Sequence, residues 1–343
     1  MNTYEIKTAL VASFLLLPLA VPQLAAAAKP LYTETRKAHL YVSDAQNAEK
    51  KGIVGPGVSR NCNIKLADGI QSMVEPWYEE MQKHSAWEDN DTGGMVQHFY
   101  RGGDKIVNGH LDPTHLCDPR FDRACEDYRH VDGADAALIA LHGVNNGDHW
   151  VGMLPNEAKS ADGSTLGCRV HAPESDPDAA PRPSTLMPGY QLRYLHVMSC
   201  NSMDPGNMNS ISRMFNRKFD VQTMSNLRII TGFHGAAAIW DDYTEHYRQT
   251  ARRGFSEGII TAWQSEHHDW PRYAEGWFEQ CPVSVGMCGS TEPEEDCIKR
   301  LSRETYWQAD SPEGRQDEDD SYAMIFAWEG CAPLYGEPWE FPS

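Results

Sequence analysis

Three short runs at the centre of the chain are rich in apolar residues, and the first of them is continuously apolar. They cover residues 136–141, 192–198 and 227–231. Such runs, without polar alternation, are typical of strands buried on both faces of a parallel sheet. Between the second and third runs, Met208, Ile211 and Phe215 recur at helical spacing. The order strand, helix, strand predicts a βαβ unit and therefore a parallel sheet.

The flanking segments add further elements to this sheet. Residues 39–43 and 95–100 are expected to form strands, and an apolar stripe over residues 66–81 predicts a helix that packs on the core. A second helical pattern spans residues 255–263, and residues 322–328 are expected to form a late strand. The predicted fold class is α/β, with a mostly parallel sheet flanked by helices.

Polar segments interrupt the predicted elements at three places. Residues 104–131, 158–188 and 281–320 are rich in charged residues, proline, glycine or serine, and are expected to be loop excursions stapled by disulfides. The middle excursion has room for a hairpin. No composition break suggests a linker, so residues 29–343 are expected to form one domain.

The first 28 residues have the pattern of a secretory signal peptide. Lys7 precedes an apolar stretch over residues 9–24, and four alanines follow at 25–28. A membrane anchor is the alternative, but two prolines interrupt the stretch and the small-residue site follows directly. We therefore expect cleavage near residue 28 and a secreted or periplasmic protein, with no membrane contact after signal removal.

Nine cysteines lie beyond the expected signal peptide: Cys62, Cys117, Cys125, Cys168, Cys200, Cys281, Cys288, Cys297 and Cys331. In an oxidising compartment cysteines usually pair, and an odd number leaves one thiol free or bonded to another chain. Cys117 with Cys125, and Cys281 with Cys288, are close in sequence and are expected to be local staples. Because Cys200 alone directly follows a predicted buried strand, we expect it to be the free thiol.

Charge removes several classes of partner. The chain of 343 residues carries 49 acidic and 30 basic side chains, for a formal net charge of −19. Nucleic-acid binding needs a basic face, and anionic lipid attracts basic segments, so neither partner is expected. The hydrophobic content of 41% is too high for a chain that is disordered throughout.

Candidate chemistry lies where the central strands end. In parallel α/β sheets, ligands bind outside the carboxyl ends of the strands. His142 and Gly143 follow the first central strand, Cys200 follows the second, and His234 lies after the third. A cysteine needs a nearby base to become a nucleophilic thiolate, and an imidazole can supply that base. The N–H groups of Gly143 and Cys200 could form an oxyanion hole.

These residues resemble a known family. An apolar strand that ends in His-Gly, followed by an apolar strand that ends in a small residue and Cys, is similar to the pattern of caspase–hemoglobinase-fold cysteine peptidases, which include caspases, legumains, gingipains and clostripain. The resemblance covers residues 132–263. It implies that Cys200 is the nucleophile and His142 the general base, that the substrate is a protein or peptide, and that no cofactor is needed.

A wider run resembles a group of secreted bacterial proteins. Its residues are Val131 and Asp132, Gly232 and Phe233, and Ala262 and Trp263. The Gln-Ala-Cys-x-Gly sequence of caspases is absent, so the cleavage preference stays open. Asp241 and Asp242 are candidate substrate-binding residues for a basic side chain. His234 is a further candidate for substrate binding, or for the base.

Two alternatives stay open. One is a catalytically silent caspase-like module that binds a protein or a glycan, for which the aromatic candidates are Trp240, Trp263, Trp270, Trp277 and Trp307. The other is a metal-dependent extracellular hydrolase with ligands from His142, His149, His234, His246, His267, His268 and Asp269. Because no His-Glu-x-x-His pattern occurs, we assign no metal ligands.

Overall fold

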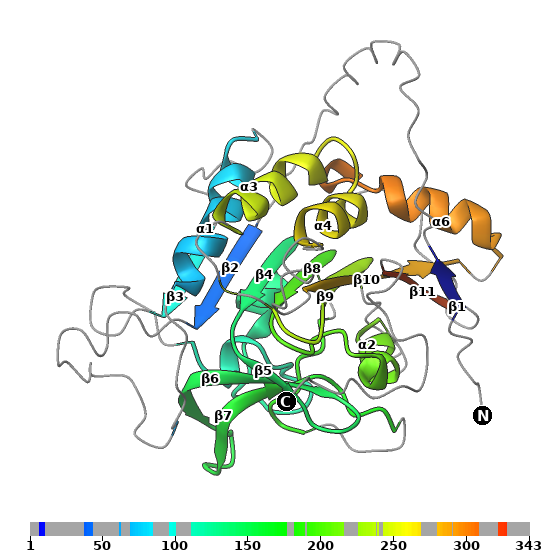
Figure 1. The fold of residues 1–343 in the computed structure, drawn as a ribbon. Coiled ribbons are helices and arrows are strands. Elements are labelled where there is room, and N and C mark those ends of the chain that lie inside the picture. The colour runs from blue at the N-terminus through cyan, green and yellow to red at the C-terminus, as the bar shows by residue number, and fades with distance from the viewer. Residues whose placement is uncertain are drawn as a thin grey trace, which may run out of the picture.

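A computed structural model provides the three-dimensional description of the chain (Figure 1). It describes residues 7–10, 38–43, 62, 69–84, 96–100, 111–176, 182–188, 191–215, 226–237, 239, 243–268, 280–289, 291–308 and 322–327.

The main sheet of the described residues has eight strands. They are β1 (Lys7–Leu10), β2 (Ala38–Ser43), β3 (Val96–Tyr100), β4 (Ala136–Ala140), β8 (Tyr194–Met198), β9 (Ile229–His234), β10 (Cys281–Cys288) and β11 (Tyr322–Ala327). Their order across the sheet is β1-β11-β10-β9-β8-β4-β2-β3. The five strands from β3 to β9 are mutually parallel, while β10 is antiparallel to both of its neighbours. The sheet is therefore mixed and mostly parallel, as predicted.

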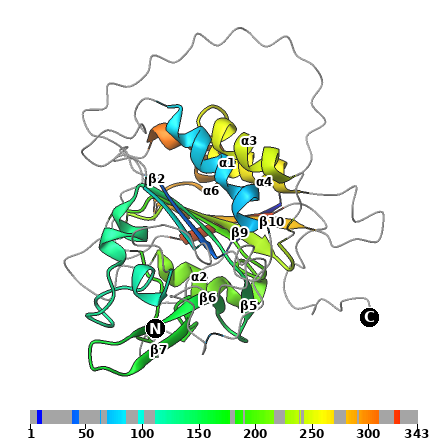
Figure 2. The same ribbon diagram turned by 90° about the vertical axis from the view of Figure 1, so that its left-hand side faces the viewer.

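Helices and a small second sheet cover the two faces of the main sheet (Figures 1 and 2). The helices are α1 (Ile70–Gln82), α2 (Met208–Met214), α3 (Tyr243–Gly254), α4 (Ile259–His267) and α6 (Glu294–Arg303). The second sheet contains β5 (Gly143–Asn145), β6 (Trp150–Lys159) and β7 (Thr165–His171), and all its pairs are antiparallel. Helices α1, α3, α4 and α6 lie on one face, whereas α2 and the small sheet lie on the other (Figure 2).

Strand β4 shows why its sequence is apolar at every position. Its residues alternate between two cores, as side chains on a strand must. Ala136, Leu138 and Ala140 pack in the core under α1, α3 and α4. Ala137 and Ile139 pack in the core on the side of α2 and the small sheet. A strand buried on both faces needs no polar side, which confirms the interpretation of the apolar runs.

The helical predictions hold with changed boundaries. Helix α1 begins at Ile70 because Gly69 before it has a left-handed φ of 93°. Of the pattern predicted over residues 255–263, residues 255–257 form a turn after the end of α3 at Gly254, and residues 259–263 begin α4. Gly258 separates them with a φ of 124°, and a side chain there would collide with the backbone of Ser302.

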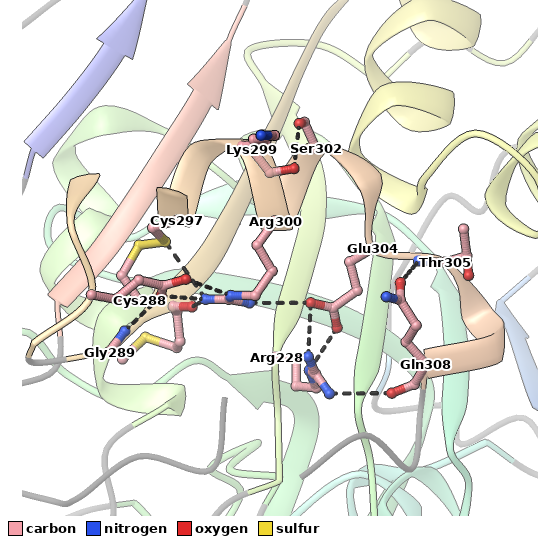
Figure 3. A network of polar contacts seen from close by, with 12 residues as sticks. Arg228, Cys288, Gly289, Cys297, Lys299, Arg300, Ser302, Glu304, Thr305 and Gln308 are labelled. Atoms are coloured by element: carbon pink, nitrogen blue, oxygen red, sulfur yellow. Dashed lines mark hydrogen bonds and ion pairs between the residues drawn. A yellow bond between two sulfur atoms is a disulfide. The ribbon is translucent and has the colours of Figure 1, made fainter. Parts of the chain in front are cut away.

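The prediction of a loop excursion over residues 281–320 is wrong for the first part of this range. Residues 281–288 form β10, which lies inside the main sheet between β9 and β11, and residues 294–303 form α6. Cys281 and Cys288 stand at opposite ends of β10, about 20 Å apart at the rise of a strand, so they cannot pair. Cys288 is bonded to Cys297 instead, which ties β10 to α6 (Figure 3).

The other excursions are also more ordered than a loop. Residues 113–115, 127–129 and 131–133 form short 3₁₀ turns. The hairpin of β6 and β7 confirms the expected hairpin in the second excursion, although it begins earlier, at Trp150.

The described cysteines are all disulfide-bonded except one. Cys62 pairs with Cys168 and Cys117 with Cys125, and Cys281 is also disulfide-bonded. Among the described cysteines, Cys200 is the free one, as predicted. Disulfides of this kind are typical of proteins that fold outside a reducing cytoplasm.

The N-terminal strand lies within the expected signal peptide. Lys7–Leu10 pairs with β11 at one edge of the main sheet, so cleavage after residue 28 would remove this edge strand. The remaining residues of the expected signal peptide lie outside the described part. Within the described part, no helix is long and apolar enough to cross a bilayer.

Candidate active site

Two neighbouring strand ends bring His142 and Cys200 to one edge of the sheet. Strands β4 and β8 pair in parallel, with Ala140 opposite Met198. The pairing continues one step further, because the Leu141 N–H donates to the Met198 carbonyl oxygen at 3.1 Å. One residue beyond that step lie His142 on one strand and Cys200 on the other. The strand order therefore places His142 and Cys200 just beyond the ends of two neighbouring strands.

This edge is also where the connections of the sheet change direction. From β2 the chain moves outward to β3 and then returns to form β4 on the opposite side of β2. Ligand sites in open α/β sheets lie at the carboxyl ends of the strands next to such a switch. His142 is the second residue after β4, so it lies beside this switch.

Gly143 approaches the cysteine backbone closely. A Cβ atom at this position would clash with the Ser199 hydroxyl and the Trp150 indole nitrogen, and would come within 2.7 Å of the Cys200 carbonyl oxygen. Only glycine leaves room for this approach. The absence of a side chain at Gly143 therefore lets the strand after His142 lie directly against the strand end that carries Cys200.

Cys200 lies at the start of a sharp turn. Its half-buried sulfur accepts a hydrogen bond from the Ala237 N–H at 3.4 Å. The next residue, Asn201, has a left-handed φ of 55° and donates its N–H to the Gly235 carbonyl oxygen at 2.7 Å. Asparagine is one of the few side chains that tolerates this conformation. The turn ends β8 abruptly and leaves the thiol at the edge.

Two serine hydroxyls hold the turn in place. The Ser199 hydroxyl accepts a hydrogen bond from the Trp150 indole at 3.1 Å, which links β8 to the small sheet. The Ser202 hydroxyl donates to the Ser199 carbonyl oxygen and accepts from the Phe233 N–H, both at 3.0 Å. The backbone around Cys200 is thus bonded to the strand ends on both sides.

His142 has the environment of a neutral imidazole. Its Nε2 atom is buried, and within the described residues it makes no hydrogen bond. Burial lowers the pKa of His142 from its ordinary value. The ring is therefore unprotonated at neutral pH and has a nitrogen free to take a proton.

His234 lies on the other side of Cys200, at the end of β9. It is buried, and its Nδ1 lies 3.7 Å from the Asp204 carboxylate. Burial lowers the pKa of His234, and the Asp204 charge opposes that change. The structure thus brings a second imidazole to the same edge, while the candidates Asp241 and Asp242 lie outside the described residues.

Within the described residues, the histidines of the alternative metal set form no group of three ligand atoms close enough to hold an ion. His149 contacts His171 beside the small sheet, His246 pairs with Glu266 on the helical face, and His267 bonds Thr250 inside it. Asp269 lies outside the described residues. Trp263, a candidate aromatic for glycan binding, is fully buried in the helical core.

One group of three potential metal ligands does occur in the described residues. Cys288, Cys297 and Glu292 lie within 4.8 Å of one another. The two sulfurs are joined in a disulfide, and Arg300 pairs with Glu292 at 2.8 Å (Figure 3). Neither sulfur is a thiolate and the carboxylate already has its cation, so this group does not form a metal centre.

Several supporting residues were not predicted from the sequence. Trp150, Ala237 and Asp204 reach the site through contacts between segments far apart in the chain. Asn201 is the one residue whose type indicates the turn after β8, because asparagine tolerates a left-handed backbone conformation.

No protein-family model, curated protein or solved structure matches this chain. The candidate site is therefore defined by its geometry alone: two adjacent strand ends, a free thiol and a neutral imidazole.

Proposed function

We propose that this protein is an exported, caspase-like cysteine peptidase. Cys200 is the nucleophile and His142 is the general base. The observation that carries the proposal is the parallel pairing of β4 with β8, which aligns the His142-Gly143 segment with the free Cys200. The order of these residues, His-Gly after one central strand and Cys after the next, supports the caspase-like type.

The reaction follows from the chemistry of this pair. His142 takes the thiol proton of Cys200, and the sulfur attacks the carbonyl carbon of a peptide bond. The N–H groups of Gly143 and Cys200 stabilise the negative oxygen of the tetrahedral intermediate. His142 then gives its proton to the departing amine, and a thioester remains on Cys200. Water, deprotonated by His142, hydrolyses the thioester and releases the acid product.

Burial of His142 suits this role. Because its pKa is lowered, the ring is neutral at neutral pH and can act as a base. A buried nitrogen without a hydrogen bond in the described residues is also free to accept the thiol proton. The rigid turn at Asn201 supports a fixed position for the sulfur, which nucleophilic attack requires.

Single substitutions test the assignment of the base. We expect Cys200→Ala to abolish hydrolysis of a fluorogenic peptide library, and His142→Asn to lower kcat/KM by about 10²–10⁴-fold. His234→Asn tests whether His234, rather than His142, is the base. The matched control is His246→Gln, which removes an exposed imidazole. Thermal denaturation shows that each variant is folded.

The outcomes separate the alternatives. A loss in His234→Asn that equals the loss in His142→Asn would contradict the choice of base. Full activity in Cys200→Ala, with loss on chelation, would replace the proposal by a metal-dependent hydrolase. If the folded wild-type protein cleaves no member of the library, the peptidase proposal is replaced by that of a catalytically silent binding module.

A further inference from the structure

A second polar cluster lies beside the small sheet, apart from Cys200. His149 precedes β6 and is 1% exposed, while His171 ends β7 and is 9% exposed. The His149 Nε2 and the His171 Nδ1 are 3.3 Å apart. Asp148 and Asn146 complete the cluster. Two buried imidazole nitrogens thus face each other beside the exposed Asn146.

Asp148 determines which nitrogen of His149 carries the proton. Its Oδ1 accepts from the His149 Nδ1 at 2.6 Å, and its Oδ2 accepts from the Ser175 hydroxyl at 2.9 Å. The His149 proton is therefore on Nδ1, and the lone pair of Nε2 points toward His171. A carboxylate on the far nitrogen is the usual support of a histidine that binds a metal ion.

His171 offers a second nitrogen. The residue is 9% exposed, and its Nδ1 faces the His149 Nε2. Imidazole nitrogens are common ligands of transition-metal ions.

The separation of the two nitrogens fits a tetrahedral ion. Two nitrogens, each about 2.0–2.1 Å from a tetrahedral zinc ion, are about 3.3 Å apart. The Asn146 side-chain nitrogen lies 3.5 Å from the His149 Nε2. A half-turn of this amide places its oxygen, which has lone pairs to offer, in the same position. Asn146 is exposed, so solvent can supply the fourth ligand.

We propose that the His149 Nε2, the His171 Nδ1 and the side-chain oxygen of Asn146 bind a divalent transition-metal ion of the zinc type. Asp148 orients His149 from outside the coordination shell. The bound ion connects the turn between β5 and β6 to the end of β7, and so stabilises the small sheet that begins at Gly143. This site does not depend on the proposed peptidase activity.

Metal binding to the full chain tests the proposal. The protein is treated with chelator, dialysed, and titrated with Zn²⁺ by calorimetry, and its metal content is measured by mass spectrometry. We expect about one zinc ion per chain. His171→Gln and His149→Gln should abolish this binding, and Asp148→Asn should weaken it by about 10–100-fold. Co²⁺ in the same site should give the visible absorption of a tetrahedral ion.

Two control variants locate the ion. His246→Gln removes an exposed imidazole and should leave the affinity unchanged, and Cys200→Ser excludes the free thiol as a ligand. If His149→Gln does not fold, His171→Gln and Asp148→Asn still decide the question. Absence of zinc binding to the folded wild-type protein, or equal affinity in His171→Gln, would overturn the proposal and leave a hydrogen-bonded Asp–His–His chain. Loss of binding in Cys200→Ser would place the ion elsewhere.

Discussion

His142 differs from an ordinary surface histidine because part of its ring is withdrawn from water. Burial disfavours its charged form and lowers its pKa below 6.5. Its base form is therefore the one present at neutral pH, without help from a carboxylate. His234, in contrast, combines burial with an Asp204 partner. The two imidazoles beside Cys200 thus differ in how their pKa values are controlled.

The pH dependence of activity follows from this environment. A base acts only when it is unprotonated, so kcat/KM should rise with pH and reach half its plateau at the pKa of His142. Because that pKa is lowered, we expect the midpoint of the acid limb below pH 6.5. Peptide hydrolysis measured from pH 4 to 8 checks this. A midpoint above 6.5 would show that the base is not a buried, unassisted His142.

Gly143 gives a steric test at the same scale. In Gly143→Ala the added methyl group would meet the Ser199 hydroxyl, the Trp150 indole and the Cys200 carbonyl. We expect a loss of about 1–3 kcal/mol in the free energy of unfolding, measured by urea denaturation, together with reduced activity. Gly206→Ala is the control, because its new methyl group is 3.2 Å from the flexible end of Asp204 and an ordinary 3.8 Å from the Asn145 side chain and the Gly147 carbonyl oxygen. Equal losses in both variants would contradict the close approach at Gly143.

At the scale of elements, α6 is bound to the sheet by a disulfide and by buried ion pairs (Figure 3). The Glu304 carboxylate, directly after α6, is 1% exposed and pairs with Arg228 at 2.6 Å. It also pairs with Arg300 at 3.3 Å. Burial raises the pKa of Glu304, and the two arginines oppose that rise. These pairs connect the end of α6 to the start of β9.

Removal of the Glu304 carboxylate should be costly. Glu304→Ala leaves Arg228 without its buried partner, so we expect a loss of about 3–5 kcal/mol in the free energy of unfolding. The matched control is Glu257→Ala, which breaks an exposed pair with Arg253 and should cost at most about 1 kcal/mol. Urea denaturation measures both. Similar small losses would show that the Glu304 pairs contribute no more than surface pairs.

The disulfides should differ in their contributions. The Cys62–Cys168 bond closes 106 positions of sequence and the Cys117–Cys125 bond only 8. Loop-closure entropy gives about 4–5 kcal/mol for the first and about 2–3 kcal/mol for the second. The double serine variants, compared by urea denaturation, should follow this order. The reverse order would show that native strain or residual denatured structure decides their effect.

At the scale of the whole molecule, the predictable part of the fold is the part whose burial is uniform. Strands β4, β8 and β9 are buried on both faces, and apolar residues dominate their sequences although His196, Thr231 and His234 are buried among them, so these strands could be predicted. Strand β10 is buried to a similar degree, yet it contains Pro282 and Ser284, and its position depends on pairing with β9 and β11. The local sequence of β10 does not indicate which strands it pairs with.

The same distinction applies to the site. His142 and Cys200 could be predicted because each directly follows an apolar strand, and parallel neighbours end at the same edge. The bond from Trp150 to Ser199 and the pairing of Cys288 with Cys297 could not, because both depend on how distant segments pack. The short distance in sequence between Cys281 and Cys288 predicts that they pair. That prediction is wrong because the two residues stand at opposite ends of β10.

The most direct test of the central claim is chemical labelling of the native, non-reduced protein. Iodoacetamide alkylates free, accessible thiols, and peptide mass spectrometry locates the label. We predict that Cys200 is the cysteine labelled in the folded protein, and that labelling at neutral pH is several-fold slower in His142→Asn. Labelling at another cysteine, or Cys200 found in a disulfide, would contradict the proposed active site.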